Sequence, residues 1–126
     1  MTTMRFTVTD DDTAIALGSG DVPVLATPRL LAWMEAATVA AAQSGLDPTS
    51  TTVGIEVWMR HRRASGVGAI IEVEVTGTTE QDRGLSFEVL ARELPAEGAA
   101  GTTGREIATG RVVRAIVDRG AFLSRL

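Results

Sequence analysis

Apolar and polar residues alternate along several stretches of the chain, which is the pattern of strands with one buried face. The first stretch is MRFTVT at residues 4–9, and TAIAL at 13–17 is a shorter extended piece. Four more follow residue 50: TTVGIEVWMRHR, AIIEVEVTG, LSFEVLARE and IATGRVVRAIV. The later four predict a meander of antiparallel strands.

Residues 27–44 form the one convincing helix. Thr27 suits the N-cap, Pro28 suits the first helical position, and Gly45 suits the position that ends the helix. The segment is rich in alanine and apolar almost all the way round, so we expect it to be buried. A strand, a buried helix and four strands predict an α+β fold in which an antiparallel sheet wraps around the helix.

Composition narrows the functional classes. The 126 residues suit a single domain spanning 1–126, and the segment at 95–104 (PAEGAAGTTG) is typical of a mobile loop. The net charge is −4 and all twelve basic residues are arginine, which argues against DNA or RNA as a partner. Without cysteine there is no disulfide or thiolate metal site, and a cytoplasmic location is the default. No apolar run is long enough to anchor the chain in a membrane.

Glu35 is the only carboxylate of the predicted helix. An isolated ionised carboxylate in an apolar setting is strongly unfavourable, so Glu35 either reaches water at the helix edge or serves chemistry. The strand that follows has a row of alternate residues on one face: Val53, Ile55, Val57, Met59 and His61. If that face covers the helix, the only histidine and Glu35 point into the same space.

Three stretches of the sequence resemble the hotdog-fold acyl-CoA thioesterase family that includes fluoroacetyl-CoA thioesterase: GSGDVPVLATPRLLAWMEAA, TTVGIEVWMRHRRASGVG and TGRVVRAIVDRGAFLSRL. Thr27, Glu35 and His61 stand at the spacing of that family's catalytic triad. The resemblance implies a hotdog fold, a homodimer and hydrolysis of an acyl-CoA thioester without a metal or other cofactor. The aromatic lid of the fluoroacetyl enzyme would fall at residues 18–21, which carry no aromatic side chain here, so we expect a more open acyl pocket.

The same three residues suit thioester hydrolysis on chemical grounds. Glu35 can act as a base or as a nucleophile, and the choice stays open. The free N–H groups at the helix start near Thr27 can bind the oxyanion, with the Thr27 hydroxyl as a further donor or simply as a cap. His61 can relay a proton near neutral pH. The alternatives are a surface Glu35 and a structural His61.

Further residues are candidates for binding the substrate. Gly18, Ser19, Gly20 and Pro28 flank the start of the helix, where the GSG segment suits a lid. Arg60 and Arg62, in RHRR at 60–63, could bind the phosphates of CoA, although such a cluster is more often a solvated strand end. The main alternative function is a non-catalytic hotdog module that binds an acyl or aromatic molecule, and a hydratase is a second alternative.

Helix geometry predicts how the site is assembled. Thr27 and Glu35 are eight residues apart, or about 12 Å at 1.5 Å per residue, so they cannot meet within one chain. A two-fold dimer that places the helix start of one subunit near Glu35 of the other would resolve this. We therefore predict an obligate homodimer with shared sites.

Overall fold

The computed structural model describes residues 2–96 and 104–126, so most of the loop predicted at 95–104 lies outside the described residues. The strands are β1 (Thr3–Thr7), β2 (Ser50–His61), β3 (Ile70–Gln81), β4 (Gly84–Glu93) and β5 (Arg105–Asp118). The helices are η1 (Asp10–Asp12), α1 (Ala14–Leu17), α2 (Thr27–Gln43) and α3 (Arg119–Ser124).

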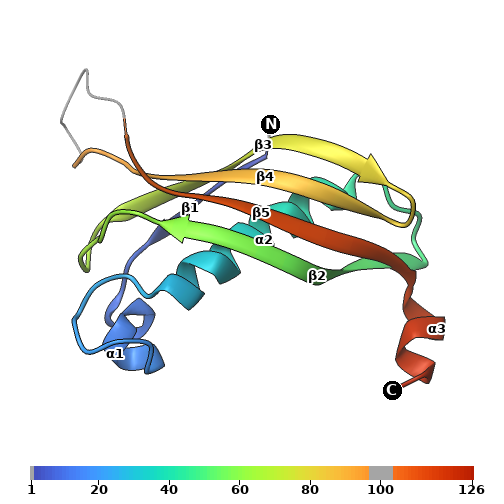
Figure 1. Cartoon of the computed structure of the whole chain (residues 1–126), viewed down its shortest axis with the longest axis horizontal. Helices are drawn as coiled ribbons and strands as arrows, with labels where there is room; N and C mark the ends of the chain where they lie inside the picture. Colours follow the sequence, from blue (N-terminus) through green and yellow to red (C-terminus); the bar gives the residue numbers. More distant parts are fainter. Residues whose placement is uncertain (1, 97–103) are drawn as a thin grey trace.

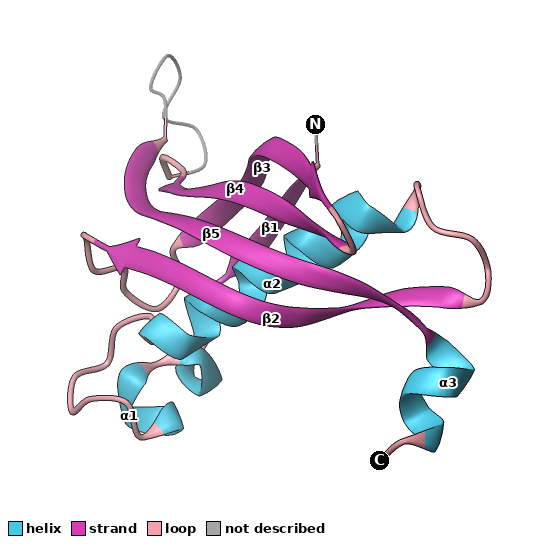
Figure 2. Cartoon of the chain, turned by 45° about the vertical axis from the view of Figure 1, so that its right-hand side comes forward, coloured by secondary structure: helices cyan, strands magenta, loops and turns pink. Residues whose placement is uncertain are grey.

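The strands form one antiparallel sheet that curls around α2 (Figures 1 and 2), in the order β1-β3-β4-β5-β2. The predicted α+β architecture, with an antiparallel sheet around one long helix, is confirmed. Its core lies between the concave face of the sheet and α2, where Leu30, Met34 and Ala37 of the helix are fully buried. At the same interface Trp33 stacks on Phe6, with ring centroids 4.6 Å apart.

The predicted meander of four strands is wrong for β2. Only β3, β4 and β5 follow one another as neighbours, whereas β2 pairs with β5 and becomes an edge strand. The segment after β2 does not turn back as a hairpin, because it is bound to the chain that precedes α2. Leu25 N donates to Ser65 O at 2.8 Å, and Val24 forms a bridge with Gly66. Because of these contacts, the segment between β2 and β3 lies against the residues that precede α2.

The local predictions also differ at the two short helices. The segment 13–17 is not extended: residues Ala14–Leu17 form α1, because Thr13 Oγ1 accepts a hydrogen bond from Ala16 N and Gly18 ends the turn with φ 68°. Helix α3 was not predicted, and it starts where Asp118 Oδ1 accepts from Ala121 N at 2.8 Å. In each of these helices the sequence signal is a single capping side chain, which predicts a helix less strongly than a periodic pattern of apolar residues does.

A glycine at the start of β4 generates a stability prediction. A Cβ at Gly84 would run into the backbone carbonyl oxygen of Arg114, whereas a Cβ at Gly66 would meet open space. We expect Gly84→Ala to lower the free energy of unfolding by about 1–3 kcal/mol, as overpacking does. Urea unfolding measures the change, with Gly66→Ala as the matched control. Equal stability of the two variants would show that β4 and β5 do not approach this closely.

Candidate active site

The first half of the site joins the start of α2 to the end of β2. Thr27 Oγ1 and His61 Nδ1 are 2.9 Å apart and share a hydrogen bond. Thr27 is the first residue of the helix and not its N-cap as predicted; Ala26 holds the cap position. The Thr27 hydroxyl therefore faces the imidazole instead of capping the helix.

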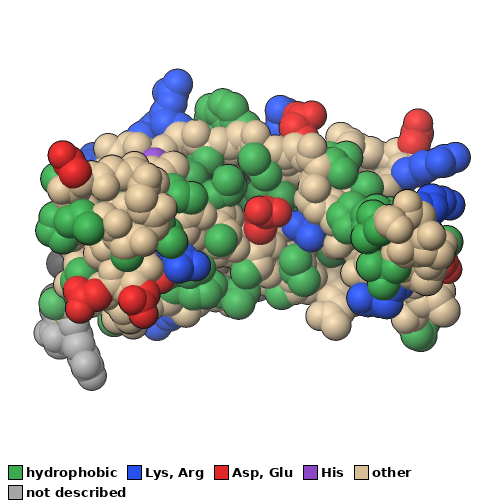
Figure 3. All heavy atoms as spheres, turned by 90° about the horizontal axis from the view of Figure 1, so that it is seen from below, with side chains coloured by type: hydrophobic (Ala, Val, Ile, Leu, Met, Phe, Trp, Pro, Cys, Tyr) green, Lys and Arg blue, Asp and Glu red, His purple; other side chains and the backbone are tan. Residues whose placement is uncertain are grey.

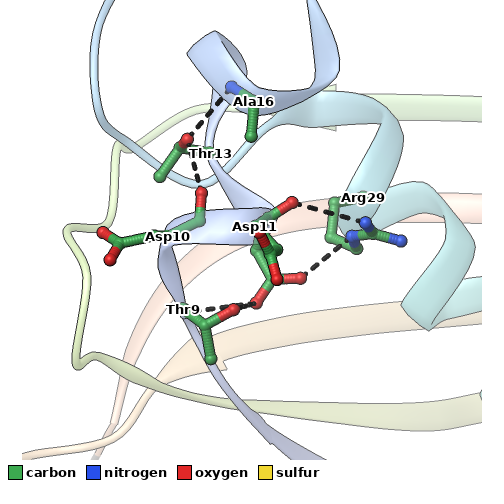
Figure 4. A network of polar contacts seen from close by, with 7 residues as sticks. Thr9, Asp10, Asp11, Thr13, Ala16 and Arg29 are labelled. Atoms are coloured by element: carbon green, nitrogen blue, oxygen red, sulfur yellow. Dashed lines mark hydrogen bonds and ion pairs between the residues drawn. The ribbon is translucent and has the colours of Figure 1, made fainter.

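A polar network holds the first turn of α2 in place (Figure 4). Arg29 Nε lies 2.9 Å from Asp12 Oδ1, and Arg29 Nη2 donates to Asp11 O at 3.4 Å. The other Asp12 oxygen accepts from both N and Oγ1 of Thr9, each at 2.8 Å. Since Ala26 N also donates to Asp12 O at 2.9 Å, η1 fixes the residue that directly precedes Thr27.

A cavity of about 290 Å³ opens beside this pair. Its lining includes Ser19, Gly20 and Arg62 together with Thr27 and His61. The other candidate substrate-binding residues, Gly18, Pro28 and Arg60, are not part of the lining. The apolar remainder of the wall comes from Ala14, Val22, Val24, Leu25 and Ala64. A small organic group can therefore reach the Thr27 hydroxyl and the His61 ring.

The surroundings of His61 change the pKa of its imidazole ring. Burial lowers the pKa of His61 below its usual value of 6.5, and a weaker interaction with the Arg63 backbone acts in the opposite direction. Nε2 is buried and has no hydrogen-bond partner among the described residues. Burial therefore favours the neutral form of the ring, which is able to accept a proton.

The second half of the site lies at the middle of α2. Glu35 Oε2 is 3.4 Å from Nη1 of Arg114, whose side chain is buried. Arg114 Nε donates to Thr52 Oγ1 at 2.9 Å, and Nη2 donates to Thr52 O at 3.3 Å. Glu35 is thus not the isolated carboxylate that its neighbours in sequence indicated. Arg114 is 79 residues away along the chain, and the only signal for it was a lone arginine in the apolar run VVRAIV.

A β-bulge corrects the predicted face of β2. The register with β5 shifts between Gly54 and Glu56, so Ile55 is an extra residue and the alternation changes phase there. Ile55 is 63% exposed instead of facing the helix. Paired residues share a face, so Gly54 lies on the face of its partner Arg114. A Cβ at Gly54 would lie 2.6 Å from Glu35 Oε2, and the glycine therefore makes room for the carboxylate.

The two half-sites do not meet within one chain. His61 pairs with Ala108 and Gly54 pairs with Arg114, and these partners are six residues apart on β5. Six residues of a strand span about 20 Å. Along α2 the distance from Thr27 to Glu35 is about 12 Å.

The unpaired edge of β2 carries exposed apolar side chains between the half-sites. Val57 and Trp58 are 44% and 51% exposed, next to Ile55 in the same strand. Hydrophobic side chains also cover much of the middle of the face seen in Figure 3. An unpaired strand edge with exposed apolar residues is typical of a surface that binds another chain.

Within the ranges 2–96 and 104–126, no helix combines the length and apolarity needed to cross a membrane.

Comparison with known proteins identifies the family. The model of the FlK family, the fluoroacetyl-CoA-specific thioesterases, matches residues 8–120. The chain belongs to this family. No curated protein sequence matches the chain. The match to the family model confirms the predicted membership in a family of thioester hydrolases.

Solved structures agree with this assignment. The fluoroacetyl-CoA thioesterase FlK is 25% identical with a TM-score of 0.80, and the match covers 98% of this chain and 89% of that one. A single-residue variant of FlK in complex with fluoroacetate and CoA matches at 25% identity and TM-score 0.81, covering 98% and 94%. A thioesterase-superfamily member from Thermus thermophilus is 20% identical with a TM-score of 0.84, covering 98% and 85%, which shows the shared fold. The hotdog fold is confirmed.

The half-buried imidazole of His61 generates a pH prediction. His61 is the only histidine, so NMR follows its titration without overlap, and we expect a midpoint below 6.5. Between the folded and unfolded pKa values the unfolded chain binds more protons, so the free energy of unfolding is highest above pH 6.5 and falls below it. Urea unfolding at about pH 7.5 and about pH 5.5 checks this. The His61→Asn variant should lack this part of the loss, and a midpoint at or above 6.5 would contradict the neutral ring.

Proposed function

We propose that this protein hydrolyses an acyl-CoA thioester to a carboxylic acid and free CoA. The observation that carries the proposal is the pair of half-sites, in which Thr27 contacts His61 and Glu35 contacts Arg114. Together they supply a carboxylate, a neutral imidazole and a helix start, which are the groups that thioester hydrolysis needs. Membership in the FlK family supports the same chemistry.

A homodimer completes the site in this proposal. Two copies related by a two-fold axis near Glu56 would align their β2 edges in antiparallel fashion and cover the exposed Ile55, Val57 and Trp58. Such an axis exchanges the two ends of β2. The His61 end of one protomer then lies beside the Thr52 end of its partner, where Arg114 holds Glu35. Two equivalent sites result.

The reaction begins with the thioester carbonyl at the start of α2. Free backbone N–H groups of the first turn and the positive end of the helix dipole stabilise the developing oxyanion. Glu35 of the partner either takes a proton from an attacking water or attacks the carbonyl carbon itself. In the first route hydroxide adds to the carbon and the C–S bond breaks. In the second, a mixed anhydride forms with loss of the CoA thiolate, and water then cleaves the anhydride.

The remaining residues orient these groups. Arg114 contacts the Glu35 carboxylate and, because it is itself held by Thr52, restricts the rotamers of Glu35. With Nδ1 as acceptor, His61 can receive the hydroxyl proton of Thr27, so a proton released at the site has a path into the imidazole. Arg60 and Arg62 are exposed next to His61 and would contact the phosphates of CoA, while Ser19 and Gly20 border the cavity.

Replacing the carboxylate tests the chemistry. We expect Glu35→Gln to reduce kcat by about 10²-fold or more, because the amide can neither accept the proton nor attack, while the fold persists. Free-thiol release is measured with acetyl-, fluoroacetyl-, butyryl-, hexanoyl- and benzoyl-CoA. Glu80→Gln, at an exposed position of β3, is the matched control. Retention of most of the rate at unchanged thermal stability would refute the role of Glu35, and tight binding of acyl-CoA without turnover by the wild type would favour a binding module.

Subunit mixing tests the shared site. Thr27→Ala and Glu35→Ala homodimers should each be inactive, whereas heterodimers regain one of two sites. Differently tagged chains are exchanged and the heterodimer is purified before thiol release is measured. We expect about half of the wild-type activity per dimer, since an isologous dimer has two equivalent sites. No recovery in a proven heterodimer would show that each site lies within one chain.

A further inference from the structure

Helix α3 forms a second cavity next to the Glu35 half-site. This cavity measures about 220 Å³ and is lined by Thr51, Thr52, Val53, Arg119, Phe122 and Leu123. Thr52 is the residue that anchors Arg114, so the cavity adjoins the Arg114–Glu35 pair. Leu123 is 56% exposed, which leaves an apolar wall of α3 uncovered in the single chain. The Thr27–His61 chemistry does not use this cavity.

The position of α3 relates it to the other half-site. Helices α1 and α3 lie on the same side of the sheet, at its two opposite ends (Figure 1). A two-fold axis that runs perpendicular to the sheet, beside the middle of the β2 edge, exchanges the two ends of β2 and keeps the helices of both protomers on the same side of the sheet. In the proposed dimer, α3 of one protomer therefore lies beside α1 and residues 19–22 of its partner.

The cavity at the partner's Thr27 has an open side at that place. Its lining includes the small residues Ser19 and Gly20 with Val22 and Val24, and residues 18–21 read Gly-Ser-Gly-Asp. No Phe, Trp or Tyr is among the described residues that line this cavity. In the proposed dimer the two cavities would face each other across the interface, with the reacting carbonyl between Thr27 of one chain and Glu35 of the other.

We propose that Phe122 and Leu123 of the protomer that supplies Glu35 form the apolar wall of the acyl-binding pocket, which the partner's Thr27 cavity completes. This proposal rests on the proposed thioesterase function and names its substrate class: acyl groups with an apolar chain longer than two carbons. Such a chain reaches Phe122, whereas an acetyl group stays at the reacting carbonyl. Phe122 is thus a specificity-determining residue and not a catalytic one.

A variant of the homodimer gives the first test. Phe122→Ala should lower the ratio of kcat/KM for hexanoyl-CoA to that for acetyl-CoA by about tenfold, mainly through KM, because lost apolar contacts affect only the longer chain. Leu126→Ala is the matched control, since Leu126 is 89% exposed and lies outside both cavities. Circular dichroism and gel filtration check fold and assembly. An unchanged ratio in Phe122→Ala, with hydrolysis retained, would overturn the role of α3 and leave the thioesterase function intact.

Heterodimers then show which chain supplies the wall. In a dimer of Thr27→Ala and Glu35→Ala chains, the single working site uses Glu35 of the first chain and Thr27 of the second. Phe122→Ala added to the Thr27→Ala chain should lower the hexanoyl-to-acetyl ratio about tenfold, and the same change in the Glu35→Ala chain should leave it unchanged. Equal effects of both placements, or the opposite order, would overturn the assignment. Absence of thiol release from the wild type would instead overturn the proposed function itself.

Discussion

The arrangement of the concave face of the sheet depends on the contacts that the buried guanidinium group of Arg114 makes. A buried charge must be paired and hydrogen-bonded, and Arg114 meets this requirement with Thr52 from β2 and Glu35 from α2. One side chain therefore joins the last strand, the edge strand and the helix. Because Arg114 contacts both Glu35 and Thr52, the position of Glu35 is coupled to the packing of the sheet.

Two departures from regular structure make that contact possible. The extra residue at Ile55 shifts the phase of β2, so that Gly54 lies on the face of Arg114 and His61 lies on the helix-facing side at the other end. The missing side chain at Gly54 leaves space for the Glu35 carboxylate. A regular strand would place either Gly54 or His61 on the wrong face, and one of the half-sites would be lost.

The sequence predicted the strands, the long helix and the α+β class, because those depend on periodicity that local residues display. Glu35 and His61 were identifiable as polar residues in apolar surroundings. The pairing of β2 with β5 was not predictable, since alternation shows that a strand exists but not which strand is its neighbour. For the same reason the Arg114 contact and the bulge at Ile55 were missed: each depends on the register between segments far apart in sequence.

The bulge in the edge strand also bears on which chains can add to this edge. A long apolar edge is a template for open-ended strand addition, which leads to fibres. Ile55 makes this edge irregular, so a generic extended strand fits it poorly, whereas a second copy carries the same irregularity. In the proposed homodimer, a two-fold contact would use the edge once on each chain and could not propagate. Among the described residues, the other edge of the sheet is β1, which has five residues, and such a short edge is a poor template for strand addition.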